Sequence, residues 1–288
     1  MKTKFLTPAE KWERLTFADD FIFYKVLEKN LDFTQELLEL LLDIKIDHIE
    51  QPSAQKDFKA DYFSKGARFD VYVKDGTGRC FDIEIQTSHF LDLAKRARYY
   101  QGVMDVDNLL TGDGYQKLKD SYVIFLCLGD SIGNGLPVYT FRYRADEDHS
   151  VLMNDDTVNI FFNAKKYDKM KSPKLRSFFE YLCKEKPDSP FTDRLAQLVE
   201  RIKTSPQERK AYMMFSEIVQ KEAQEMREEG RAEGRVEGME EGQRKKAFET
   251  AKNLLAKGIE ADVIAECTGL PYAQVEELQK ELMAISAK

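Results

Sequence analysis

The chain has 288 residues and a formal net charge of −7, and its apolar and charged fractions are those of a soluble globular protein. The acidic balance argues against a general polyanion binder, which is usually basic. It leaves a nucleic-acid enzyme possible, because basic residues cluster at 95–98 and at 165–176.

Cysteine and histidine usage narrows the function classes further. Four cysteines are scattered without a CxxC pair, which argues against a disulfide framework or a zinc site and indicates reduced thiols in a cytoplasmic compartment. The chain has only three histidines, so we do not expect a multi-histidine metal centre or a histidine-based catalytic triad. No run of about 18 apolar residues occurs, so we expect no membrane span and no membrane among the partners.

The N-terminal part of the chain predicts two helices. The first begins near Thr16, a candidate N-cap with Asp19 three residues later, and runs through about Leu27. The second covers about 33–42 with a strong leucine stripe, and Thr34 is its candidate cap. Residues 44–51 then form a short extended segment.

Two alternating arms follow, over 68–73 and 80–86, and Asp75-Gly76 between them is a strong hairpin signal. On the second arm Asp82, Glu84 and Gln86 point one way, while the intervening apolar side chains point the other way. Asp70 shares the polar face of the first arm with Tyr72. The arms therefore form a hairpin with one carboxylate-rich face.

The loop length decides which residues of this hairpin face each other. A two-residue loop would pair Asp70 with Ile83 and bring opposite faces together, which is excluded. A loop at 76–78 with Gly78 at positive φ pairs Asp70 with Glu84. Their Cβ atoms would then lie about 5 Å apart. Opposed like charges are destabilising unless a cation or a shared proton joins them, and Mg²⁺ would resolve the conflict. The simpler alternative is a solvated sheet face.

The next segments complete a mixed α/β sheet domain that ends near residue 170. Residues 91–103 have helical spacing, and 121–128 are nearly all apolar, as in a strand that is buried on both faces. Residues 137–143 alternate and 158–162 are apolar, so both predict further strands. With the helices in front, this order predicts a sheet that is flanked by helices.

Residues 173–225 predict helices, after which the composition changes. A tetrapeptide repeat places glycine at 230, 234, 238 and 242. Three further helix-like segments follow, at about 246–257, at 261–268 and, after Gly269-Leu270-Pro271, to about 284. The C-terminal part is therefore an all-helical extension.

Four features, in order, resemble one known family: the run Thr16–Tyr24, the carboxylate hairpin, Arg96-Ala97-Arg98-Tyr99-Tyr100, and the late Glu-Gly repeats. They resemble the recombination-promoting nucleases, also described as transposases, of the PD-(D/E)XK nuclease superfamily. The resemblance implies a restriction-endonuclease-like core, Mg²⁺-dependent cleavage of DNA as the partner, and a link to recombination and mobile DNA.

The resemblance also implies roles for individual residues. Asp70 and Glu84 would be the metal ligands, and Gln86 stands where the superfamily usually has lysine. Gln86 can position a water but cannot be a general acid or base at neutral pH. Asp20 matches an acidic position that completes the site, and the alternative is a first-turn residue that complements the helix dipole.

Arg96 is the candidate substrate-binding residue, because it could hold a phosphate or orient the carboxylates. Arg98 is two residues away and cannot share a helix face with it, so only one of the two is expected to act there. The alternative is a solvated helix face, and Tyr99-Tyr100 would then be core packing.

The glycine repeat permits two interpretations. Each glycine costs a helix up to about 1 kcal/mol relative to alanine, which favours a flexible, charged linker. In a helix, however, the glycines form one stripe between an arginine stripe and a glutamate stripe, so a close parallel pair would bring Arg against Glu. The second interpretation predicts a homo-oligomer through this segment.

The last segment has the outline of a helix-turn-helix, but its second helix carries Glu276, Glu277 and Glu281 and only Lys280. Acidic side chains would repel phosphates, so we expect a small helical hairpin for assembly instead of a DNA reader. The expected domains are a nuclease-like domain at 1–172, a helical segment at 173–225, the repeat at 226–245 and the hairpin at 246–288.

Two functions follow from these observations. The first is a Mg²⁺-dependent DNA endonuclease with Asp70 and Glu84 on the metal, Gln86 positioning water and Asp20 assisting. The second is a non-catalytic, oligomeric interaction or regulatory protein on a nuclease-like core. The uncharged Gln86 and the acidic net charge favour the second, and the opposed carboxylates favour the first.

Overall fold

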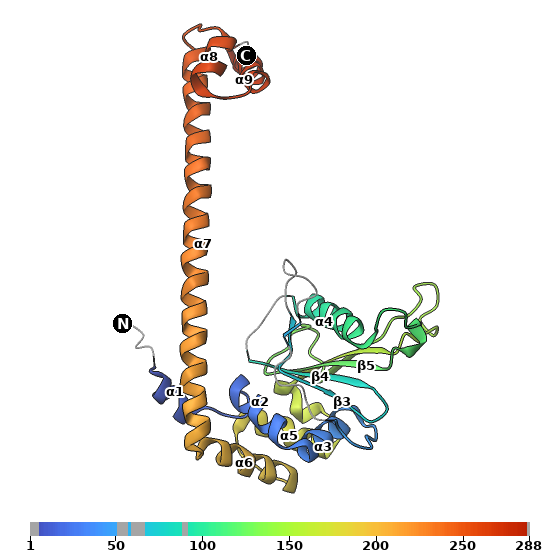
Figure 1. Cartoon of the computed structure of the whole chain (residues 1–288). Coiled ribbons are helices and arrows are strands. Elements are labelled where there is room, and N and C mark those ends of the chain that lie inside the picture. The colour runs from blue at the N-terminus through green and yellow to red at the C-terminus, as the bar shows by residue number, and fades with distance from the viewer. Residues whose placement is uncertain (1–5, 51–56, 59–66, 88–91, 287–288) are drawn as a thin grey trace. The chain divides into compact units, whose positions relative to one another are not determined.

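A five-stranded mixed sheet lies at the centre of the N-terminal unit, residues 1–213, in the computed structural model of the chain (Figure 1). The structure describes residues 6–50, 57–58, 67–87 and 92–286. The strand order of the five-stranded sheet is β3-β4-β5-β7-β6. The strands are β3 (Val71–Lys74), β4 (Cys80–Gln86), β5 (Ser121–Cys127), β6 (Val138–Phe141) and β7 (Thr157–Asn163).

The three inner strands, β4, β5 and β7, run parallel, and the outer strands β3 and β6 are antiparallel to their neighbours. A separate two-stranded ladder joins β1 (Asp57–Phe58) to β2 (Ala67–Arg68). This mixed sheet with flanking helices confirms the predicted fold class. No helix in the described ranges is long and apolar enough to cross a bilayer.

Helices cover both faces of the sheet (Figure 1). On one face lies α4 (Leu93–Asn108). On the other lie α2 (Asp20–Lys29), α3 (Leu31–Leu42) and α5 (Pro173–Lys184), and α6 (Pro190–Lys203) packs against α2 and α5. Three short helices complete the unit: α1 (Pro8–Arg14), η1 (Tyr115–Lys117) and η2 (Ala164–Lys169).

Strict alternation along β4 divides its side chains between these two layers. Phe81, Ile83 and Ile85 are buried on the face opposite α4. On that face Phe162 of β7 stacks on Phe179 of α5 with ring centroids 5.0 Å apart. The even-numbered residues of β4 face α4, where Leu93, Ala97, Tyr100 and Met104 pack on β5 and β7. Asp82, Glu84 and Gln86 are therefore buried between β4 and α4.

The turn between β3 and β4 has the loop that the sequence predicts. Lys74 pairs with Cys80 and the Asp75 N–H donates to the Arg79 carbonyl at 3.0 Å, which leaves Gly76, Thr77 and Gly78 as the loop. Gly78 has φ of 87°. One Asp75 oxygen accepts from the Thr77 and Arg79 amides, at 2.9 and 3.0 Å. These hydrogen bonds fix the loop length and, through it, the register of the hairpin.

The N-terminal helices differ from the prediction in three respects. The helix α1 was not predicted; a Thr7–Glu10 capping box and Pro8 begin it. The second predicted helix, α3, begins at Leu31, so Thr34 is not its cap. Thr34 is instead buried inside α3 and donates to the carbonyls of Leu27 and Asn30. Thr16 does lie at a capping turn, where its N–H donates to Asp19 at 2.7 Å, but α2 itself begins at Asp20.

In the second unit, residues 214–288, all the described secondary structure is helical, and short turns join the helices. The helix α7 (Pro206–Leu255) begins in the first unit and includes the whole glycine repeat without a break. Its C-terminal end packs with α8 (Ala261–Thr268) and α9 (Tyr272–Ser286) around a small apolar core. Gly269 ends α8 in the left-handed region, as a C-cap glycine does.

Substituting Gly78 tests the importance of the turn. We expect Gly78→Ala to lower the free energy of unfolding by about 1–2 kcal/mol, because alanine is strained at positive φ and its Cβ would lie 3.3 Å from Lys119. Urea denaturation followed by circular dichroism measures the change. The control is Gly102→Ala in α4, where a Cβ meets nothing within 4 Å and should stabilise the helix by about 0.5–1 kcal/mol. A Gly78→Ala protein as stable as wild type would contradict this account.

Candidate active site

Asp70 and Glu84 face each other at the open end of the hairpin, as the predicted register requires. Val71 pairs with Ile83 and Tyr72 with Asp82, so the next opposed pair is Asp70 and Glu84. The Asp70 N–H donates to Oε1 of Glu84 at 2.9 Å, and the Ile85 N–H donates to Oδ2 of Asp70 at 3.1 Å. Each carboxylate thus accepts a hydrogen bond from a backbone amide of the facing arm, where regular pairing stops, and this bond fixes its position.

Arg96 supplies the positive charge at this pair. Its Nη2 donates to Oε2 of Glu84 at 2.7 Å, across from the bond that Asp70 makes to Oε1. The guanidinium lies over the rings of Phe125 and Tyr100, at 4.8 and 5.5 Å from their centroids. Such stacking holds the guanidinium in place and adds a cation–π attraction. Of the two roles predicted for Arg96, the structure shows the contact that orients a carboxylate.

Burial controls the protonation of this site. Burial, and after it the negative charge of Asp70, raises the pKa of Glu84 to about 8. The guanidinium of Arg96 acts in the opposite direction and lowers this pKa. Only 2% of Glu84 is exposed, so water does little to stabilise its charged form. Glu84 therefore retains a proton at a higher pH than an ordinary carboxyl group does.

Asp82 is a third buried carboxyl group at this site, and the sequence analysis did not assign it a role. It is fully buried, and among the described residues neither of its oxygens has a hydrogen-bond partner. Burial first, and then the charges of Glu84 and Asp70, raise its pKa well above the usual value. The alternation of β4 already placed Asp82 on the face of Glu84, so the signal for it was present in the sequence.

Gln86 and Asp20 occupy different positions relative to this pair. Gln86 is the last residue of β4, lies on the face of Glu84 and is 6% exposed. Asp20 is the exposed first residue of α2, where a carboxylate also complements the helix dipole. The structure thus joins Asp70, Glu84 and Arg96 by direct contacts and places Gln86 on the same face; a site role for Asp20 stays a prediction.

The donor set fits a small divalent cation with oxygen ligands. Mg²⁺ is usually held by one or two carboxylates, and waters and substrate phosphates complete its coordination. In the described ranges no three His, Cys, Asp or Glu side chains are grouped so as to hold a metal by themselves. Each carboxylate oxygen offers two lone pairs, so the bonds from Asp70 and Arg96 leave acceptor capacity on Glu84.

Comparison with known proteins assigns a family. A sequence profile for the family described as PD-(D/E)XK nuclease family transposase matches residues 18–250, which include the hairpin, α4 and the glycine repeat. No significant match was found among curated proteins or among solved structures. PD-(D/E)XK nucleases typically use divalent metal ions, in agreement with the oxygen donors at the hairpin. The chain belongs to the PD-(D/E)XK nuclease family transposases.

Proposed function

We propose that the protein is a Mg²⁺-dependent DNA endonuclease that acts in recombination or transposition. The observation that carries the proposal is the opposed pair of Asp70 and Glu84, whose carboxylates accept from the backbone amides of Ile85 and Asp70, with Arg96 beside Glu84. Family membership supports a nuclease-like role and DNA as the partner. A cation or a shared proton relieves the repulsion between opposed buried carboxylates, and hard oxygen donors favour Mg²⁺ as that cation.

In this proposal Asp70 and Glu84 would hold the metal. When bound, such an ion lowers the pKa of a water and neutralises charge that develops on a phosphodiester. Arg96 keeps Glu84 in place and contributes positive charge to a site that receives a phosphate. The amide of Gln86 can donate to or accept from a water at the end of β4 and so orient it, but it cannot take up its proton. Asp20 would assist from the start of α2.

Cleavage of supercoiled plasmid tests the function. We expect nicking by the wild-type protein with Mg²⁺ and none with EDTA, and a loss of about 100-fold or more in Asp70→Ala, because one of two metal ligands is removed. The control is Asp146→Ala, which removes the same charge from an exposed position between β6 and β7. If wild-type protein does not cleave with any divalent metal, the non-catalytic alternative is favoured and the proposal fails.

The raised pKa of Glu84 predicts a pH-dependent metal affinity. A metal binds the ionised carboxylate, and a group with a pKa of about 8 is mostly protonated below that pH. Between about pH 6.5 and about pH 8.5 the affinity for Mn²⁺, a spectroscopic substitute for Mg²⁺, should rise about 20-fold, as the ionised fraction does. Electron paramagnetic resonance of free Mn²⁺ measures it without any turnover.

Two arginine variants make this measurement specific. Arg96→Gln removes the cation that favours ionised Glu84, so the rise in affinity should move to higher pH. Arg98→Gln, on an exposed position of the same helix, should leave the pH profile unchanged. An affinity that is independent of pH over this range would show that Glu84 is not a ligand or that its pKa is not raised.

We also propose that α7 associates with a second copy of the chain through its glycine stripe. Over 231–246 every side chain whose exposure is described is solvent-exposed, including Val236 and Met239. Cβ atoms at Gly230, Gly234, Gly238 and Gly242 would meet nothing within 4 Å among the described residues. A parallel pair places Arg opposite Glu, and the four-residue period limits the close contact to a few turns.

The mass of the full-length protein in solution tests this pairing. Size-exclusion chromatography with light scattering should give a multiple of the chain mass, and Gly234→Leu with Gly238→Leu should reduce it, because leucine prevents close approach of the helices while favouring the helix. The control, Val236→Leu with Glu240→Leu, adds leucines to the opposite side of α7. A wild-type protein with the mass of one chain would exclude the pairing.

A further inference from the structure

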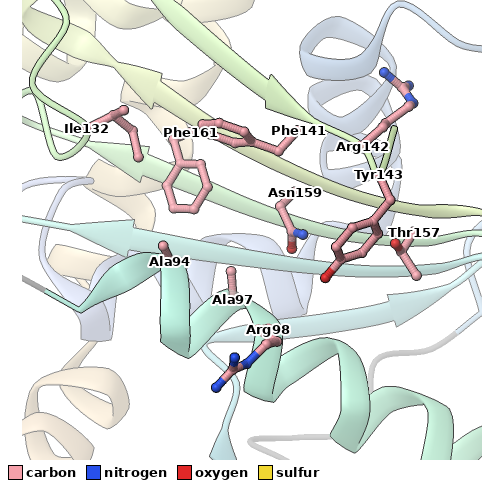
Figure 2. A pocket seen from close by; sticks show the side chains of 10 residues that line it. All are labelled: Ala94, Ala97, Arg98, Ile132, Phe141, Arg142, Tyr143, Thr157, Asn159 and Phe161. Atoms are coloured by element: carbon pink, nitrogen blue, oxygen red, sulfur yellow. The ribbon is translucent and has the colours of Figure 1, made fainter. Parts of the chain in front are cut away.

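A pocket of about 310 Å³ opens on the α4 face of the sheet, between α4 and the neighbouring strands β7 and β6 (Figure 2). Nothing in the proposed chemistry uses it. The pocket is lined by residues from α4, from the β5–β6 loop, from β6 and the two residues after it, and from β7. These residues are Ala94, Ala97, Arg98, Ile132, Phe141, Arg142, Tyr143, Thr157, Asn159 and Phe161. Its volume lies at the lower end of the range for ligand sites, so it suits one small ring system.

The pocket exists because small residues on α4 face aromatic residues on the strands. Ala94 and Ala97 leave space below Phe161, and Figure 2 shows the rings of Phe141 and Phe161 above these alanines. Phe141 meets Phe161 edge to face with centroids 5.8 Å apart. Phe141 and Tyr143 are 46% and 53% exposed. Two rings thus present apolar surface to solvent beside a gap that no described side chain fills.

The chemistry of the lining favours a flat, polar-edged ring over an aliphatic ligand. Aromatic faces bind other π-systems by stacking, which every nucleobase can do. Asn159 lies between the rings and α4 in Figure 2, and its Oδ1 accepts from the Gln101 amide at 3.3 Å. Among the described residues the amide nitrogen of Asn159 has no hydrogen-bond acceptor, so it can donate to the edge of a ring. Arg98 borders the same gap from α4 and adds a positive charge for a phosphate.

The pocket and the carboxylates lie on one face of the sheet. Glu84 pairs with Phe125, and Phe125 pairs with Phe161, so Glu84 and Phe161 are in one row two strands apart, about 10 Å. A single strand that reaches from a phosphate at Glu84 to a base at Phe161 therefore has to span about 10 Å. Arg96 and Arg98 lie on different faces of α4, because residues two apart in a helix do not share a face. Arg96 contacts Glu84, and Arg98 lines the pocket.

We propose that this pocket binds an unpaired nucleobase of the DNA, about 10 Å from the phosphate at Asp70 and Glu84. The inference rests on the proposed nuclease function and specifies its substrate as DNA that is single-stranded or locally unpaired there. A base inside a duplex cannot enter, because its faces are stacked on its neighbours and its edge is paired. Exposed aromatics that alternate with arginines, Phe141-Arg142-Tyr143-Arg144, fit a single-stranded nucleic-acid surface.

The test measures binding without cleavage. Wild-type protein in EDTA is titrated onto a single-stranded oligonucleotide that carries 2-aminopurine, whose fluorescence falls when the base stacks. We expect quenching and tight binding by wild type, and about 10-fold weaker binding with loss of quenching in Tyr143→Ala, which removes a stacking ring. Ala94→Trp, at an exposed position of α4, should fill the pocket and do the same. Tyr115→Ala removes an 82% exposed ring outside the pocket and should change neither.

Each further outcome decides the proposal. Quenching that Tyr143→Ala leaves intact, or affinity for a matched duplex equal to that for the single strand, overturns it. Free 2-aminopurine riboside monophosphate that binds as tightly as the oligonucleotide also overturns it, because the occupant would then be a free nucleotide. Because the oligonucleotide titration is done in EDTA, a protein that does not nick plasmid can still bind the oligonucleotide and quench its fluorescence. Conversely, if the protein nicks plasmid but shows no quenching, the proposed binding of a nucleobase in the pocket is wrong and the proposed nuclease function stands.

Discussion

Asp70 and Glu84 are opposed across two strands by a register that leaves no alternative pairing, and the rest of the site depends on that register. The loop at 76–78 sets it, and Gly78 at φ of 87° with the bonds to Asp75 holds the loop. Opposed carboxylates repel each other, more strongly with Asp82 buried beside them. The molecule offsets this repulsion with backbone N–H donors, with the guanidinium of Arg96 and with raised pKa values.

The helix α4 connects most of the functional features of the N-terminal unit. It covers the carboxylate face of β4, so Asp82 and Glu84 are buried beneath it, and it supplies Arg96 to that face. On its other side two alanines and Arg98 border the aromatic residues of β6 and β7. One helix on a five-stranded sheet covers the centre better than the far edge. The same arrangement therefore produces a buried carboxylate site and an open aromatic pocket.

Much of this could be predicted from the sequence because it depends on local patterns. Alternation and the glycine loop predicted the faces and register of the hairpin, and the apolar run at 121–128 predicted the central strand. The cap at Thr34 was wrong because a buried threonine can satisfy its hydroxyl on carbonyls inside a helix, as Thr34 does on Leu27. The contact between Arg96 and Glu84 was one of two possibilities, because helical spacing alone does not orient α4 on the sheet.

The pocket could not be predicted, since its walls come from elements that are distant in sequence. Ala94 and Phe161 come together only when β5 and β7 pair in parallel with α4 above them. Asp82 was on the predicted face, but an alternating pattern does not show which polar residues a helix will cover. Tertiary packing, not local propensity, decides whether such a carboxyl group is solvated or buried.

The carboxylate site is also local along the chain, and this has a consequence for how it forms. Asp70 and Glu84 are 14 residues apart, and Arg96 follows Glu84 by 12. Loop-closure entropy rises with chain separation, so these contacts cost less to close than the pairing of Cys80 with Ser121, which encloses all of α4. The charged geometry is thus the low-contact-order part of the unit, and the parallel strands that bury it are the high-contact-order part. Repulsion among the carboxylates is strengthened only when the slower, long-range pairing removes water from them.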